Sequence, residues 1–170
     1  MRGLTLVLCL IATTLAAQQP VPTAPESTRA ESTRSAAPPT PEQLRYVQGL
    51  RTAGRGIAQL KSAVTRVSGA RGNPARLKQA ARRLGGLCGT ARGFMTSGRA
   101  KMQPTAYQDS TRVKARRLAA QIDSMIRAVP VCEMNAARQP DSTVAGLQLR
   151  IRGYETALRD FRVAVALPNR

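Results

Sequence analysis

Four stretches of the sequence place apolar residues three and four positions apart, and this spacing constrains the fold more than any other feature. The stretches are similar in length, and the short segments between them contain proline or glycine. Apolar residues at this spacing occupy one face of an α-helix, and no long stretch alternates as a half-buried strand does. The pattern predicts an all-α, up-down four-helix bundle. A dimer of two helical hairpins is the alternative.

The first helix is predicted from Pro41 to about Gly69, and we place the bundle at residues 41–167. Thr40 and Gln43 match the Thr-x-x-Gln capping box that begins many helices, with proline in the first turn. The expected buried stripe is Leu44, Val47, Leu50, Ile57, Leu60, Val64 and Val67.

The second helix is predicted from Pro74 to about Ser97, with Asn73 as its N-cap. Its apolar face contains Leu77, Ala81, Leu84, Cys88, Ala91 and Met95. A second series of small residues recurs every four positions, at Ala81, Gly85, Gly89 and Gly93. Because each glycine inside a helix costs about 1 kcal/mol relative to alanine, we expect the series to serve close packing. The expected partners are Gly49, Ala53 and Gly56 of the first helix.

The third helix is predicted to begin near Thr105, after Pro104, and to end at Pro130, because proline disrupts a helix interior. Its apolar residues are Leu118, Ile122, Met125, Ile126 and Val129. The fourth helix opens at residues 140–142 and has the most regular spacing of all. Its apolar residues are Val144, Leu147, Ile151, Tyr154, Leu158, Phe161 and Val165, followed by Pro168.

The first forty residues differ from the rest of the chain. Residues 1–17 combine a basic start at Arg2, an apolar run and small residues at Ala16 and Ala17, which predicts a secretory signal peptide. Residues 18–40 are rich in Pro, Ala, Ser and Thr and predict a disordered linker. The protein is therefore expected to be exported and to be periplasmic or secreted.

Two cysteines remain after removal of the signal peptide, Cys88 and Cys132, and an oxidising compartment favours a disulfide between them. The expected packing of the second and third helices argues against this pairing. If the chain reverses near Lys101, Cys132 lies about 27 Å beyond the residue that faces Cys88, whereas a disulfide needs alpha carbons within about 7 Å. The favoured solution is a disulfide with a second helix that is broken or kinked at Gly85-Gly86. Pairing between chains, or a simply buried Cys88, are the alternatives.

The sequence contains no motif that indicates an enzyme. The chain contains no histidine, so catalytic and metal sites that need an imidazole are excluded. No phosphate-binding loop or dinucleotide fingerprint is present, and the carboxylates are scattered. We therefore expect a protein that is not an enzyme and holds no cofactor or metal.

The basic charge is the most informative functional feature. The net charge is +18, and thirteen Lys and Arg residues lie between Glu42 and Asp109 with no acidic residue among them. Such charges repel one another without local relief, and a bound polyanion would relieve the repulsion. The candidate contacts are Arg45, Arg55, Arg66, Arg76, Arg82, Arg83 and Arg92. An arginine-rich coding bias without functional consequence is the alternative.

The expected partner is an anionic envelope component, such as lipid or glycan phosphates, or an acidic or unfolded protein. Arginine binds phosphate bidentately, so peripheral contact with a membrane fits this expectation. Nucleic acid is not expected, because the protein is predicted to be exported and has few aromatic residues for base stacking. The apolar stripes would serve equally as a monomer core or as the seam of a homodimer.

Two short motifs suggest a second hypothesis. Pro39-Thr40-Pro41-Glu42-Gln43 and Pro104-Thr105-Ala106-Tyr107-Gln108 resemble the doubled Leu-Thr-x-x-Gln signature of a family of exported helical stress chaperones. Proline replaces the leucine in both copies, and the likeness covers about ten residues. The resemblance implies small all-helical dimers whose basic concave face holds unfolded clients. It also implies helix caps at Thr40, Gln43, Thr105 and Gln108. A periplasmic holdase is therefore the alternative to an envelope-binding protein.

Overall fold

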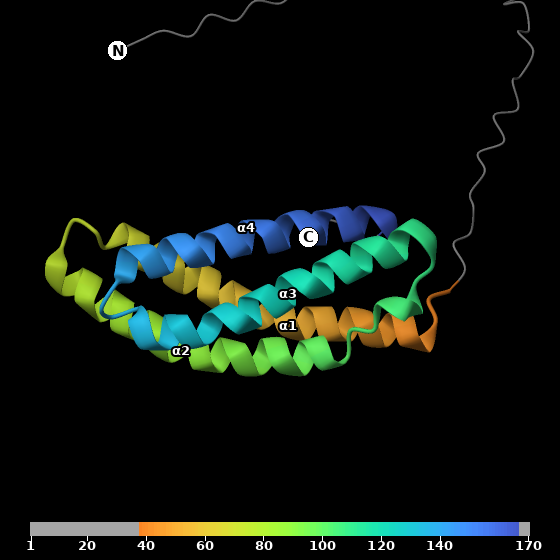
Figure 1. The fold of residues 1–170 in the computed structure, drawn as a ribbon, viewed down its shortest axis with the longest axis horizontal. Helices are drawn as coiled ribbons and strands as arrows, with labels where there is room; N and C mark the ends of the chain where they lie inside the picture. Colours follow the sequence, from red (N-terminus) through yellow and green to blue (C-terminus); the bar gives the residue numbers. More distant parts are fainter. Residues whose placement is uncertain (1–37, 167–170) are drawn as a thin grey trace, which may run out of the picture. The chain divides into compact units, whose positions relative to one another are not determined.

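The structure, a computed structural model, describes residues 38–166 and contains helices and no strands in that range (Figure 1). It confirms the predicted all-α class. The predicted signal peptide, most of the predicted linker and the end of the chain after Ala166 lie outside the described residues. The elements are α1 (Pro41–Gly69), α2 (Pro74–Ala100), the 3-10 turn η1 (Pro104–Ala106), α3 (Asp109–Asn135) and α4 (Pro140–Ala164).

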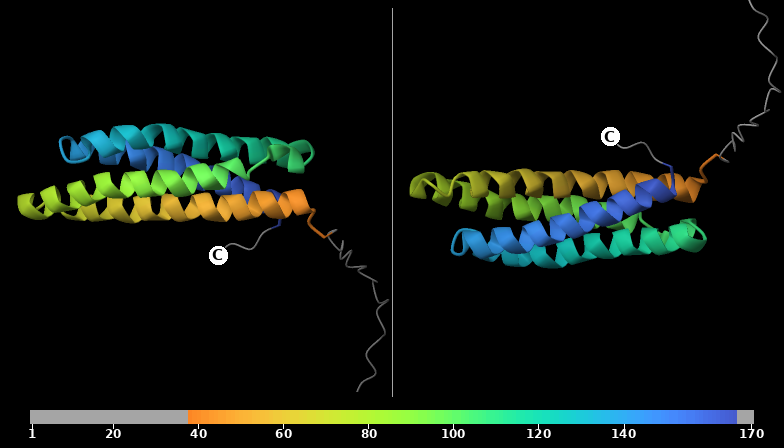
Figure 2. Two further views of the ribbon diagram at one scale, coloured as in Figure 1. Left: turned by 90° about the horizontal axis from the view of Figure 1, so that it is seen from below. Right: turned by 90° about the horizontal axis from the view of Figure 1, so that it is seen from above.

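The four helices form a bundle in which each helix packs antiparallel to the one before it. The α1–α2 hairpin makes one layer and the α3–α4 hairpin makes the other (Figure 2). The ion pair Lys61–Glu155 joins α4 to α1, and the pair Arg71–Asp141 joins the start of α4 to the turn between α1 and α2. The tip of the first hairpin, between α1 and α2, projects beyond the corresponding turn of the second hairpin (Figures 1 and 2).

The first two helices begin as predicted. The Thr40 side chain accepts a hydrogen bond from the Gln43 amide at 3.3 Å, and Gln43 Oε1 accepts one from the Thr40 amide at 3.0 Å. Asn73 Oδ1 accepts a hydrogen bond from the Arg76 amide at 3.0 Å. These side chains satisfy amides that have no partner within their own helix.

The third helix begins and ends later than predicted. Thr105 lies in η1, Tyr107 is extended, and α3 starts at Asp109 with no side-chain cap from Gln108. The implied second pair of caps is therefore wrong, because burial of the Tyr107 ring interrupts the helix. At the other end, α3 continues past Pro130 to Asn135. Proline costs one backbone hydrogen bond there, but buried residues on both sides hold the chain helical.

The predicted apolar faces form the core with one clear error, in the first turns of α1. Leu44 was expected to be buried, but it is 56% exposed. Tyr46 is fully buried instead, and its hydroxyl donates a hydrogen bond to the carbonyl of Ala115 at 2.7 Å. Its ring packs against Tyr107 and Phe161, with 5.2 Å between centroids in each pair. A large ring with a polar partner thus replaces the leucine in the core.

Small residues bring α1 and α2 close together, but through a different set on α2 than predicted. On α1, Gly49, Ala53 and Gly56 do face α2. A methyl group added to Gly56 would lie 2.6 Å from the carbonyl oxygen of Ala91, and one added to Gly98 would collide with the backbone of α1. Gly98 therefore makes the close contact that we had expected of the four-residue glycine series.

The predicted glycine series of α2 does not pack on α1. Methyl groups added to Gly85 and Gly89 would approach Glu133 of α3, at 3.5 and 3.1 Å, and Gly93 has open space around it. The spacing of these residues correctly placed them along a helix, but it did not show which neighbour they face.

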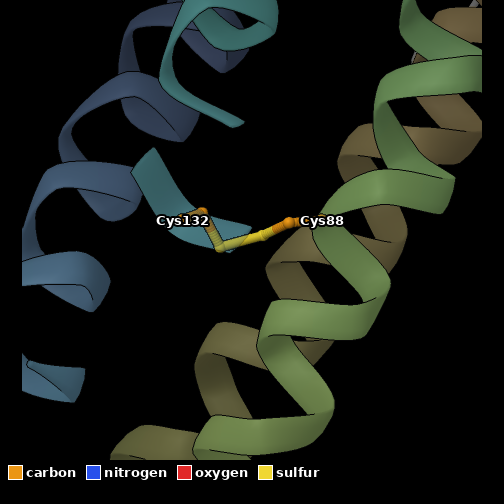
Figure 3. The surroundings of a disulfide bond; sticks show 2 residues. All are labelled: Cys88 and Cys132. Atoms are coloured by element: carbon orange, nitrogen blue, oxygen red, sulfur yellow. A yellow bond between two sulfur atoms is a disulfide. The ribbon is translucent and has the colours of Figure 1, made fainter. Parts of the chain in front are cut away.

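Cys88 and Cys132 form a disulfide with their alpha carbons 6.2 Å apart (Figure 3). The disulfide prediction is confirmed, but the predicted break at Gly85-Gly86 is wrong because α2 is continuous through both residues. The bond joins α2 to α3 and therefore links the two hairpins covalently.

The connection between α2 and α3 explains how a straight α2 reaches Cys132. Residues 101–108 continue past the end of α2 along the first turns of α1, where Gln43 Nε2 donates to the carbonyl of Ala106 at 3.3 Å. As a result α3 begins farther along the bundle than α2 ends. Asp123, about 21 Å from the start of α3 at helical rise, is the residue that pairs with Arg99. This shift brings Cys132 opposite its partner.

We predict opposite effects for alanine at two glycines of α2. Gly98→Ala should lower the free energy of unfolding by about 1–3 kcal/mol, because the added methyl group forces α1 and α2 apart. Gly93→Ala, the matched control, should raise it by about 0.5–1 kcal/mol, because that exposed helical position has open space around it. Urea denaturation followed by circular dichroism measures both values, and equal effects would contradict the packing described here.

We predict that reducing the disulfide destabilises the bundle by about 4 kcal/mol, the loop-closure value for a separation of 44 residues. The measurement is the urea midpoint with and without reductant. The double variant Cys88→Ala/Cys132→Ala should match the reduced protein and should not respond to reductant. An unchanged midpoint after reduction would show that the two cysteines are not joined.

Candidate functional site

The basic residues of the first hairpin are less isolated in the structure than the sequence suggested. Lys61, Arg71 and Arg99 reach across to carboxylates of the second hairpin, at Glu155, Asp141 and Asp123. The sequence predicted that no carboxylate would offset the repulsion among these basic residues, and for these three residues that prediction is wrong. The pairs at Lys61 and Arg71 are largely exposed, and such pairs contribute roughly 0–1 kcal/mol.

Three of the seven predicted anion-binding residues converge on one depression at the tip of the first hairpin. Arg66 comes from the last turn of α1, and Arg76 and Arg83 come from one face of α2, two turns apart. All three are exposed, and none forms an ion pair with a described residue. We call this depression, of about 190 Å³, the tip hollow. Its lining residues are Ala63, Arg66, Ala70, Arg76, Gln79, Ala80, Arg83 and Leu87.

The local sequence explains why the tip hollow is positive. Arg76 and Arg83 are seven residues apart, which places them on the same side of a helix two turns apart. Between them the surface carries Gln79 and Ala80, so no carboxylate lines the depression. The first turn of α2 also lacks an acidic residue, and the helix N-terminus adds partial positive charge. The tip hollow can therefore receive an anion without expelling a bound carboxylate.

The other four predicted residues lie elsewhere. Arg55 lines a separate groove between α1 and α4. Arg45, Arg82 and Arg92 are exposed and line neither depression. The structure therefore brings together three of the seven candidates and separates the rest.

The α1–α4 groove was not predicted from the sequence. It has a volume of about 800 Å³ and combines an apolar floor with a basic rim. No local signal marked it, because its two walls come from the first and last helices of the bundle. Its lining residues are Val47, Leu50, Arg51, Gly54, Arg55, Ile57, Ala58, Lys61, Tyr154, Glu155, Leu158 and Arg162.

The three tyrosines are buried in and near this part of the bundle. Burial raises the pKa of Tyr154 to about 12, although the positive charge of Arg162 opposes the shift. Burial also raises the pKa of Tyr46 and of Tyr107 above the ordinary value. All three are therefore neutral phenols at physiological pH.

Within residues 38–166, no group of three His, Cys, Asp or Glu side chains is arranged to hold a metal ion. In the same range, no helix is long and apolar enough to cross a bilayer.

Comparison with protein-family models, with curated proteins and with solved structures gave no match to this chain. The likeness to the Leu-Thr-x-x-Gln chaperones therefore rests on the two short motifs. Of these, only Thr40 and Gln43 form the cap that the likeness implies.

We predict that the native tyrosines ionise at higher pH than those of the unfolded chain. The unfolded chain loses its phenolic protons near pH 10, whereas the folded protein keeps that of Tyr154 up to about 12. The stability that this contributes is fully present below pH 10 and is lost as pH rises through the folded pKa. Tyrosinate absorbance in native buffer and in urea measures the shift. Coinciding titration curves would show that the three phenols are accessible to water.

Proposed function

We propose that this protein is an exported, non-enzymatic helical binding protein of the bacterial cell envelope. The tip of its first hairpin contacts the phosphate groups of an anionic lipid or glycan. The observation that supports this function best is the convergence of Arg66, Arg76 and Arg83 around one depression without a carboxylate. Each guanidinium offers a planar set of donors that matches a phosphate group.

The position of the tip hollow favours contact with an extended surface. The tip of the first hairpin projects beyond the second hairpin, so a flat anionic surface can approach it (Figure 2). Two of the arginines are on α2 and the third is on the adjoining end of α1, so the backbone that carries them is already ordered. Binding then requires only the side chains to lose freedom, which lowers its entropic cost.

Two further observations support the choice of partner and compartment. The disulfide fits an oxidising compartment, as the predicted signal peptide at residues 1–17 does. The aromatic rings of Tyr46, Tyr107, Tyr154 and Phe161 are all buried, and Phe94 is half-buried. Few rings are therefore available to stack on the bases of a single-stranded nucleic acid.

A holdase chaperone is the second candidate. The observation that favours it is the set of large apolar side chains exposed among the described residues, because such side chains can bind the apolar segments of an unfolded client. They are Leu44, Val113, Val131, Met134, Leu149 and Val163. A holdase would suppress client aggregation at equimolar ratio with little dependence on salt, whereas phosphate contact weakens as salt rises.

We predict that the protein sediments with phosphatidylglycerol vesicles at roughly 0.01 M salt, that the binding weakens at 0.15 M, and that neutral phosphatidylcholine vesicles bind nothing. The triple variant Arg66→Gln/Arg76→Gln/Arg83→Gln should lose about 3 kcal/mol of binding, roughly a hundredfold, at about 1 kcal/mol per basic residue. Co-sedimentation measures the bound fraction.

The matched control is Arg116→Gln/Arg127→Gln/Arg152→Gln, which removes the same charge from exposed positions of the second hairpin. It should keep most of the binding. Equal losses in the two triple variants would mean that net charge alone drives association. If the protein does not bind these vesicles at low salt, the proposed phosphate contact is wrong. The next measurement would then be whether the protein suppresses aggregation of an unfolded client, as a holdase would.

A further inference from the structure

The α1–α4 groove has the length of one acyl chain. Its lining runs from Val47 to Lys61 on α1, about 21 Å at helical rise, and from Tyr154 to Arg162 on α4, about 12 Å. An acyl chain spans about one leaflet of a bilayer's hydrocarbon core, roughly 15 Å. The volume of about 800 Å³ is also in the range of small-molecule pockets.

The floor of the groove is apolar. Leu50, Ile57 and Tyr154 form its base and are 3–7% exposed, and Val47 and Leu158 are half-buried at its sides. A methyl group added to Gly54 would lie 3.4 Å from the Tyr154 hydroxyl, so glycine leaves this floor open along α1. A methylene chain lying here would remove apolar surface from water on both itself and the protein.

The rim of the groove is positively charged and would attract a negatively charged ligand. Arg51 and Arg55 are one helical turn apart, both are exposed, and neither forms an ion pair with a described residue. The one carboxylate in the lining, Glu155, is paired with Lys61. A carboxylate at the end of an acyl chain would therefore meet two guanidinium groups within reach of the apolar floor.

A second copy of the chain fits the groove less well. In a symmetric dimer the same surface meets itself, so Arg51 and Arg55 of one protomer would approach the same residues of its partner. The groove supplies no excess of carboxylates to offset that repulsion.

We propose that the α1–α4 groove binds one long-chain fatty acid, with its carboxylate at Arg51 and Arg55 and its chain over Ile57 and Tyr154 toward Lys61. This inference is independent of the proposed membrane contact, because it uses residues outside the tip hollow.

The test is isothermal titration of the full chain with laurate below its micelle concentration. One laurate should bind per chain. Lauryl maltoside, which has the same chain and a neutral head, and butyrate, which has the head without the chain, should both bind at least about tenfold more weakly. Arg51→Gln/Arg55→Gln should weaken laurate binding about tenfold or more, whereas Arg116→Gln/Arg152→Gln, with the same loss of charge at exposed positions of the second hairpin, should not change it.

A second variant tests the chain-binding part of the groove. Ala58 is exposed and lies in the lining, so Ala58→Trp should fill the space without disturbing the core and should abolish laurate binding. Circular dichroism checks that each variant is folded. The proposal is overturned if laurate does not bind, or if both arginine pairs weaken binding equally. It is also overturned if the ligand-free chain is a dimer that Ala58→Trp dissociates, because a second copy would then occupy the groove.

Discussion

The register of the bundle depends on how the connection between α2 and α3 is held against the start of α1. The Tyr107 ring packs edge-on against Tyr46 and Phe161, which places the connection at one end of the bundle core. Tyr46 also reaches α3 through its hydroxyl, so α1 holds α3 in place together with the Arg99–Asp123 pair from the end of α2. The shifted register brings Cys132 to Cys88, so the packing of the connection and the covalent bond between the hairpins require the same alignment of α2 and α3.

The sequence was sufficient to predict the helix faces, the first two caps and the disulfide, because apolar spacing and capping are local properties. Its errors share one physical cause. Thr105 has a good capping sequence and Pro130 is a strong helix breaker, yet burial of neighbouring side chains overrides both local preferences. The predicted kink in α2 arose from placing the chain reversal at Lys101, and the position of that reversal is set by tertiary contacts.

The sequence predicted the positive charge of the candidate site, but it did not predict which arginines lie together. A sequence shows that an arginine is exposed on a helix, but the facing helix decides which arginines share a depression. Arg76 and Arg83 could be paired by their seven-residue spacing, whereas Arg66 joins them only because α1 and α2 pack antiparallel. The α1–α4 groove had no sequence signal at all, since its apolar floor belongs to stripes that a closed bundle would bury completely.

The disulfide also changes how the chain responds to proteolysis. It encloses the second half of α2, the connection and nearly all of α3 in one covalent ring, with α1 and α4 outside it. A protease that cuts residues 101–108 would open this ring without releasing a fragment. The nicked molecule would remain two helical hairpins held by one sulfur–sulfur bond, and it would separate only on reduction.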